Sequence, residues 1–87
     1  MRADRKKVEK LLKTARGQLD GILKMIEDNR YCIDISNQIL AAESVLKKAN
    51  REIIKSHLEG CVTEAIEQGS GKEKLDEIML TIEKMTK

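Results

Sequence analysis

Apolar residues recur at steps of three and four along most of this chain, and that spacing restricts it to helices. One such pattern runs from about residue 4 to residue 28, and a second spans about 34 residues and ends before Gly69. Steps of three and four place side chains on one helical face, whereas strands alternate. The chain of 87 residues contains no Pro, Phe or Trp. We therefore predict an all-α protein, a single domain over residues 1–87. Its third, shorter helix is marked by Leu75, Ile78, Met79, Ile82 and Met85.

Two short segments separate the predicted helices. Asp28-Asn29-Arg30 ends the first apolar pattern, and Gly69-Ser70-Gly71 is a joint before the third. Gly17 and Gly21 fall inside the first helix, where each costs about 1 kcal/mol relative to Ala. We expect them to permit the close approach of another helix.

The second helix is too long to be covered by its neighbours in the chain. It would extend roughly 50 Å at the standard helical rise, about twice the length of the first. A lone hairpin would leave a long apolar seam in water. We therefore expect two hairpins to join as an antiparallel dimer, which forms a four-helix bundle.

Three residues of this second helix are candidate metal ligands. His57 and Cys61 are four apart and share a helical face. Cys32 points within about 20° of the same direction but lies roughly 37 Å from His57 along a straight helix. The three meet only if Cys32 of one chain faces the pair of an antiparallel partner. Two thiolates and one imidazole suit Cu(I), whereas Zn(II) usually takes a fourth ligand. The alternative is that the cysteines are inert packing residues.

Basic residues gather in two parts of the sequence. Up to Lys24 the chain has eight basic and three acidic residues, and a second cluster holds Lys47, Lys48, Arg51 and Lys55. If the turn centres near residues 29–30, residue n of the first helix lies beside about residue 59 − n of the second. The two clusters then merge into one surface, whose members include Arg5, Lys13 and Arg16. We expect it to hold double-stranded DNA through phosphates, unless it is only a solvated face.

Several functions are excluded by what the chain lacks. No apolar run approaches the roughly 20 residues of a membrane span, and Met1–Lys10 is charged, so we expect a cytoplasmic protein without a membrane partner. No nucleophile–base pair, phosphate loop or pair of catalytic carboxylates is visible. We therefore expect neither an enzyme nor a small-molecule substrate.

Five segments of the chain together carry a resemblance to a known family. They are Ala15-Arg16-Gly17-Gln18-Leu19-Asp20-Gly21-Ile22, Arg30-Tyr31-Cys32-Ile33-Asp34-Ile35, Gln38-Ile39, Lys47-Lys48-Ala49-Asn50 and His57-Leu58-Glu59-Gly60-Cys61. They closely resemble the copper-sensitive operon repressors of bacteria, the CsoR/RcnR family. The resemblance extends from about Lys7 to Ile82 and implies a homotetrameric helical repressor. Such a repressor binds operator DNA when metal-free and releases it when Cu(I) binds Cys32, His57 and Cys61.

The resemblance also implies roles for residues around the ligands. Tyr31 and Glu77 match the partners of the metal-bound imidazole. Leu11 departs from the pattern, because many members carry a basic residue there. The positions that match the DNA-facing charge of the family are Lys13, Arg16, Lys47, Lys48 and Arg51.

Other members of the family leave two alternatives open. Nickel and cobalt sensors use further histidines, including one near the start of the chain, and residues 1–4 contain none. Persulfide sensors keep both cysteines but lack the histidine, so His57 argues against that branch. The remaining alternatives are a persulfide- or electrophile-sensing repressor that acts through Cys32 and Cys61, and a copper-buffering bundle that never contacts DNA.

Overall fold

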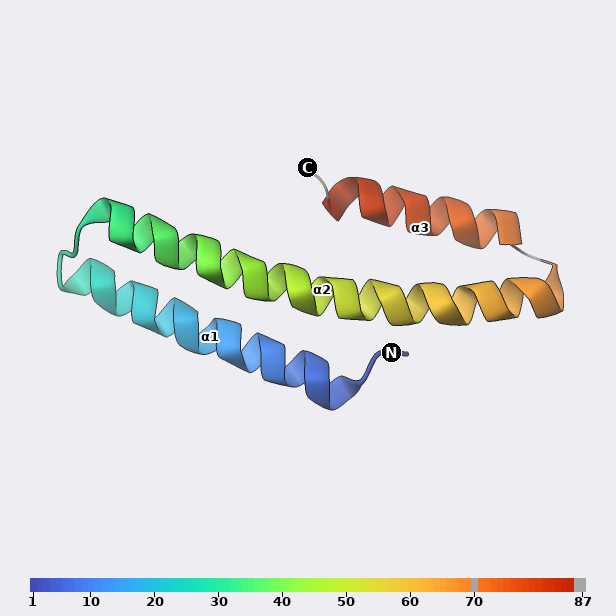
Figure 1. Cartoon of the computed structure of the whole chain (residues 1–87), viewed down its shortest axis with the longest axis horizontal. Helices are drawn as coiled ribbons and strands as arrows, with labels where there is room; N and C mark the ends of the chain where they lie inside the picture. Colours follow the sequence, from blue (N-terminus) through green and yellow to red (C-terminus); the bar gives the residue numbers. More distant parts are fainter. Residues whose placement is uncertain (70, 86–87) are drawn as a thin grey trace. The chain divides into compact units, whose positions relative to one another are not determined.

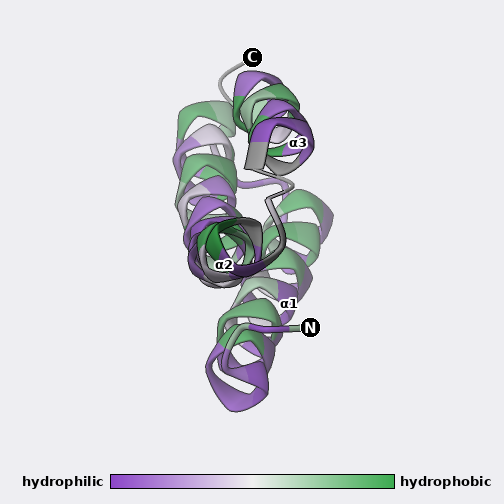
Figure 2. Cartoon of the chain, turned by 90° about the vertical axis from the view of Figure 1, so that its right-hand side faces the viewer, coloured by the Kyte–Doolittle hydropathy of each residue, from purple (hydrophilic) through white to green (hydrophobic). Residues whose placement is uncertain are grey.

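The computed structural model describes residues 1–69 and 71–85, without the side chains of residues 65, 68, 71 and 74. Three α-helices make up nearly all of this part of the chain, and it contains no strand (Figure 1). They are α1 (Arg5–Glu27), α2 (Cys32–Gln68) and α3 (Gly71–Met85). The prediction of three helices is confirmed, with 37 residues in α2 rather than about 34. Figure 2 shows that each helix carries both hydrophobic and hydrophilic residues.

The chain divides into two compact units. One contains residues 4–52, which are α1 and the first part of α2. The other combines residues 1–3 with the described residues from Ile53 onward, which include the rest of α2 and α3. Because α2 runs through both units, a single domain over residues 1–87 stays a prediction.

Local interactions define both ends of α1. The Asp4 carboxylate accepts hydrogen bonds from the backbone N–H groups of Lys6 and Lys7, at 3.0 and 3.3 Å, and so caps the first turn. At the other end Asn29 adopts a left-handed conformation with φ of 52°. Its N–H donates to the Ile26 carbonyl, and the next N–H donates to the carbonyl of Met25. This is a Schellman motif, and it explains why the helix breaks at the predicted Asp28-Asn29-Arg30 segment.

The unit of residues 4–52 is an antiparallel helical hairpin (Figure 1). Its buried seam repeats every seven residues and consists of Val8, Ala15 and Ile22 on α1 with Ala42 and Ala49 on α2. Lys7 and Glu52 form an ion pair across the hairpin at 3.1 Å between Nζ and Oε1. The residue numbers of Lys7 and Glu52 add to 59, as the predicted register requires, so that register is confirmed.

Gly17 and Gly21 do not approach another helix within the chain. A Cβ atom built at either position would meet no atom within 4 Å. No helix of the same chain makes the predicted close approach, and an approach by a helix of a second chain stays a prediction. At about 100° per residue both glycines point away from Ala15, which lies on the buried face of α1.

The hairpin leaves much of its apolar surface in water. Five large side chains beside the buried seam are between 43% and 61% exposed: Leu12, Leu19 and Leu23 on α1, and Ile39 and Leu46 on α2. They lie within about 80° of the seam residues of their own helices, so they widen one apolar face rather than forming a separate one. A face of this kind suits burial against a further helix pair.

In the second unit, α3 folds back beside the later part of α2 (Figure 1). Gly69 has φ of +71°, a left-handed conformation that suits Gly at the end of a helix, in agreement with the predicted joint. Ser70 lies outside the described residues. Ala3, Cys61 and Ile78 are the buried apolar residues described in this unit.

Candidate functional site

Two of the predicted metal ligands lie in contact on α2. The Nε2 atom of His57 is 3.4 Å from Sγ of Cys61, one helical turn away. Cys61 is only 1% exposed, whereas His57 is partly exposed. Because the four-residue spacing is built into the helix, this thiol–imidazole pair requires no further element to form it.

A carboxylate of α3 approaches the same imidazole. Oε1 of Glu77 lies 3.9 Å from Nε2 of His57, which is within ion-pair range but too long for a hydrogen bond. The side chains are 41% and 60% exposed, respectively. Glu77 thus lies where the family resemblance places it, close to the imidazole. The same ring nitrogen faces both Sγ of Cys61 and the carboxylate.

Cys32 and Tyr31 belong to the other unit. Cys32 is the first residue of α2, and its thiol is exposed. Tyr31 precedes the helix, is 66% exposed, and its carbonyl accepts a hydrogen bond of 3.2 Å from the N–H of Ile35. Within the described part of one chain, no three His, Cys, Asp or Glu side chains are placed to hold a metal ion. The structure therefore brings His57, Cys61 and Glu77 together in one unit, and Cys32 and Tyr31 belong to the other.

All six predicted DNA-contacting residues are exposed and belong to the hairpin unit. In the confirmed register, the predicted DNA-contacting residues of α1 and those of α2 lie on neighbouring turns of the two helices. Lys13 and Arg16 line a common surface depression together with Glu9 and Leu12. The six residues are Arg5, Lys13, Arg16, Lys47, Lys48 and Arg51.

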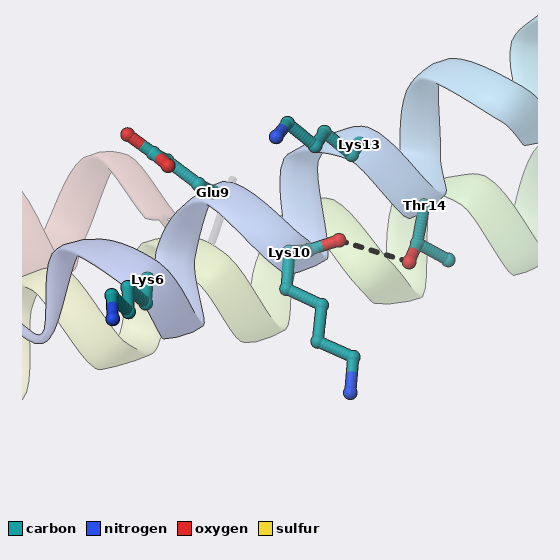
Figure 3. Close-up of a pocket in the computed structure, with 5 residues that line it drawn as sticks. All are labelled: Lys6, Glu9, Lys10, Lys13 and Thr14. Carbon is teal, nitrogen blue, oxygen red and sulfur yellow. Dashed lines mark hydrogen bonds between the residues drawn. The ribbon is translucent and has the colours of Figure 1, made fainter.

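A second depression extends this basic surface toward the start of α1. Lys6, Lys10 and Lys13 line it together with Glu9 and Thr14 (Figure 3). The Thr14 hydroxyl donates to the carbonyl of Lys10 at 2.9 Å. The set of six predicted residues omitted Lys6 and Lys10. Lys10 and Lys13 follow Lys6 by four and seven residues, which places all three on one helical face. That spacing was the signal that could have identified Lys6 and Lys10.

Acidic residues near this surface are paired with its basic ones. Oε1 of Glu9 lies 2.8 Å from Nε of Arg5, four residues earlier on α1. Glu52 forms the ion pair with Lys7 that crosses the hairpin. These pairs partly neutralise Arg5 and Lys7.

No helix in the described residues is both long enough and apolar enough to cross a membrane.

Comparison with known proteins assigns the class of the chain. The sequence model of one family, described as metal-sensitive transcriptional repressors, matches residues 4–84. The chain belongs to this family. Membership confirms the resemblance inferred from the sequence, and because the family consists of repressors, it agrees with the expectation that the chain is not an enzyme.

Among relatives, the chain is similar to the copper-sensing transcriptional repressor CsoR of Mycobacterium ulcerans (strain Agy99). The two are 46% identical over 68 residues, which cover 78% of this chain and 58% of the relative. The chain thus spans less than two thirds of the length of that relative. CsoR of Bacillus subtilis (strain 168) is 37% identical over 76 residues, 87% of this chain and 75% of that protein.

Two solved structures share the fold. The copper-sensing repressor CsoR with Cu(I) from Geobacillus thermodenitrificans NG80-2 matches with a TM-score of 0.84 and 41% identity, over 94% of this chain and 85% of that chain. The nickel-responsive transcriptional regulator InrS matches with a TM-score of 0.85 over 98% of this chain and 96% of that chain. Its 24% identity supports a likeness of fold alone.

Proposed function

We propose that this chain is a cytoplasmic Cu(I)-responsive transcriptional repressor. It binds double-stranded operator DNA when metal-free and releases it when Cu(I) binds Cys32, His57 and Cys61. The observation that carries the proposal is the contact between His57 and Cys61, two soft ligands 3.4 Å apart on one helical face. The similarity to a Cu(I)-bound CsoR at 41% identity supports the choice of metal.

The chemistry of the donor set fits Cu(I). Thiolate sulfur and imidazole nitrogen are the ligands that a soft monovalent ion prefers, and the site contains two thiolates and one imidazole. The buried Cys61 and the exposed Cys32 would supply the thiolates, and His57 the nitrogen. Bound Cu(I) would supply a link between these groups that neither thiol can make alone. No carboxylate is needed as a ligand, so Glu77 is left to orient the ring.

A second chain completes the proposed site. Cys32 lies 25 residues before His57 on the same continuous helix, so it serves best as a ligand for an antiparallel partner. The exposed apolar residues of the hairpin, among them Leu19 and Leu46, would be buried in such a dimer. Two hairpins then form a four-helix bundle, and two dimers form the tetramer.

The basic surface of the hairpin is the proposed DNA interface. Lysine and arginine side chains on a helical surface neutralise backbone phosphates, and this contribution to affinity does not depend on sequence. Arg5, Lys13, Arg16, Lys47, Lys48 and Arg51 would contact the duplex, and Lys6 and Lys10 border the same surface.

The link between metal and DNA runs through the imidazole. A ligand shifts an equilibrium only by its difference in affinity for the two states, so copper must favour the DNA-free form. A metal-bound His57 would use its other ring nitrogen for Glu77 and Tyr31, as metal-bound histidines usually do. This would tighten the contact of 3.9 Å between α2 and α3 in the loaded protein.

Titration of the complex between the protein and its operator tests the proposal. Stoichiometric Cu(I), added anaerobically to the complex, should release the DNA, and an equal amount of a persulfide donor should not. Release by persulfide alone would favour the sensor of reactive sulfur. Tight Cu(I) binding by a protein that binds no DNA at low salt would favour the copper-buffering bundle.

A further inference from the structure

Arg2 contacts α2 at two positions, and Ala3 beside it is buried. Arg2 forms an ion pair with Glu64, although the two are 62 positions apart in the sequence. The side chain of Arg2 also lies directly on the backbone at Gly60, where an added Cβ atom would overlap Nη1, Cδ and Cζ of Arg2. Ala3, the next residue, is buried at 7% exposure. These residues all belong to the unit that contains His57 and Cys61.

The docking position is on the ligand side of α2. Gly60 directly precedes Cys61, and Glu64 lies three residues after it. At about 100° per residue, Glu64 points within about 20° of His57, and Gly60 within about 60°. Arg2 therefore spans the turn of α2 from Gly60 to Glu64, which contains Cys61. Glycine at position 60 fits this contact. Gly inside a helix is destabilising, and it is used where another group, here the Arg2 side chain, must approach the backbone closely.

We propose that residues 1–3 form a latch that restricts access to the Cys61 thiol. Arg2 is the positioning residue of the latch. Its side chain lies on the backbone of Gly60 and forms an ion pair with Glu64. Cys61 is 1% exposed, and Arg2 lies on the residue that directly precedes it, so opening of the latch is the proposed route by which a metal donor or a thiol reagent reaches the thiol. That the entering ligand is Cu(I) rests on the proposed function. The latch itself rests only on these contacts.

The contacts also suggest that the latch opens readily. The side chains of Arg2 and Glu64 are 42% and 35% exposed, so water competes for both charges. Asp4, the residue after the latch, caps the start of α1 and marks where the docked segment ends. A short segment held by one partly exposed ion pair and one buried alanine can exchange without unfolding the helices.

Alkylation of the metal-free protein by iodoacetamide tests the latch. The reagent is neutral, so a change of charge at residue 2 does not attract or repel it. Mass spectrometry follows Cys61 and Cys32 in the same sample, and the exposed Cys32 serves as the internal reference. We expect Arg2→Gln to raise the rate at Cys61 relative to Cys32 by up to about fivefold, the factor expected from losing an exposed ion pair.

Gly60→Ala provides the second variant. It keeps the charges of Arg2 and Glu64 and changes only the space on the backbone of residue 60 that the Arg2 side chain occupies. We expect it to raise the Cys61 rate at least as much as Arg2→Gln does. Gly21→Ala is the matched control, since a Cβ atom there has nothing within 4 Å. Equal Cys61 rates in Arg2→Gln, Gly60→Ala and the control would overturn the latch. So would a rise at Cys61 matched by an equal rise at Cys32, because that pattern indicates general loosening.

Failure of the latch and failure of the proposed function give different results. The alkylation assay contains neither copper nor DNA, so a protein that ignores Cu(I) can still have a working latch. If the wild-type protein responds to Cu(I), a working latch should also make transfer of Cu(I) to a chelator faster from Arg2→Gln than from the wild-type protein. An unchanged transfer rate in that variant would overturn the role of the latch in metal access.

Discussion

Replacing Glu77 by Gln separates the metal-free and copper-loaded roles of the contact between α2 and α3. The change removes a charge but keeps the size of the side chain, so the exposed position of Glu77 on α3 should accept it. In the structure the contact is long, at 3.9 Å, and both side chains are more than 40% exposed. An exposed ion pair of this kind contributes about 0.2–1 kcal/mol. Operator affinity without copper should therefore change by less than about fivefold.

The loaded protein should respond more strongly to the same substitution. Removing the partner of a metal-bound histidine typically reduces metal affinity or activity by about 10–100-fold. Allosteric coupling between two ligands is typically about 5–150-fold. We therefore expect Glu77→Gln to lose most of the Cu(I)-driven release, with Cu(I) still held by the two thiolates. His57→Ala should behave in the same way, because it removes the imidazole that α3 contacts.

The assay compares operator affinity with and without stoichiometric Cu(I) by fluorescence anisotropy. Glu73→Gln is the matched control, since it makes the same change of charge in the first turn of α3. If Glu77→Gln and Glu73→Gln released DNA to the same extent as the wild-type protein, the His57–Glu77 contact would not be the coupling element. If either change reduced metal-free affinity by far more than fivefold, the contact would be stronger than its exposure indicates.

Three further predictions concern the ligands, the DNA surface and the first helix. Cys32→Ala and Cys61→Ala should each abolish tight Cu(I) binding, and mixing the two variants should restore it in heterodimers; no recovery despite proven subunit exchange would exclude an intersubunit site. Lys48→Ala or Arg51→Ala should weaken operator binding and reduce the slope of log K against log salt by about 0.9 per lost phosphate contact, whereas unchanged binding across a salt series would place the DNA elsewhere. Asp4→Ala removes an acceptor for two backbone N–H groups and should destabilise the fold by about 1 kcal/mol, which lowers the melting temperature measured by circular dichroism by several degrees. An unchanged melting temperature would show that this cap contributes nothing.

Interactions between residues close in sequence could be predicted because the helix itself determines them. The four-residue spacing of His57 and Cys61 places the two ligands on neighbouring turns of α2, and their atoms are in contact. The break at Asn29 follows from its ability to adopt a left-handed conformation. The Lys7–Glu52 pair follows from the position of that break, because a short turn determines the register of the two helices it joins.

Periodicity did not decide what covers each face of the first helix. The sequence shows that this helix is apolar on one side, but not that Ala15 is buried while a Cβ atom at Gly17 or Gly21 would meet no atom of the same chain within 4 Å. The apolar positions of α1 differ in the same way. Val8 is buried, whereas Leu19 is 49% exposed, although both belong to one apolar face.

The sequence by itself determined the three helices, the hairpin register and the contact between His57 and Cys61. Each depends on backbone periodicity or a short turn, and those are local. The family resemblance named Glu77 as a partner of the imidazole, but only the tertiary structure gave their separation of 3.9 Å and placed Arg2 on Gly60 beside Glu64. Helical periodicity does not predict a contact between His57 and Glu77, which are 20 positions apart, or between Arg2 and Glu64, which are 62 positions apart. Such contacts exist because whole helices pack in one arrangement, and the free energy that selects it is summed over many side chains at once.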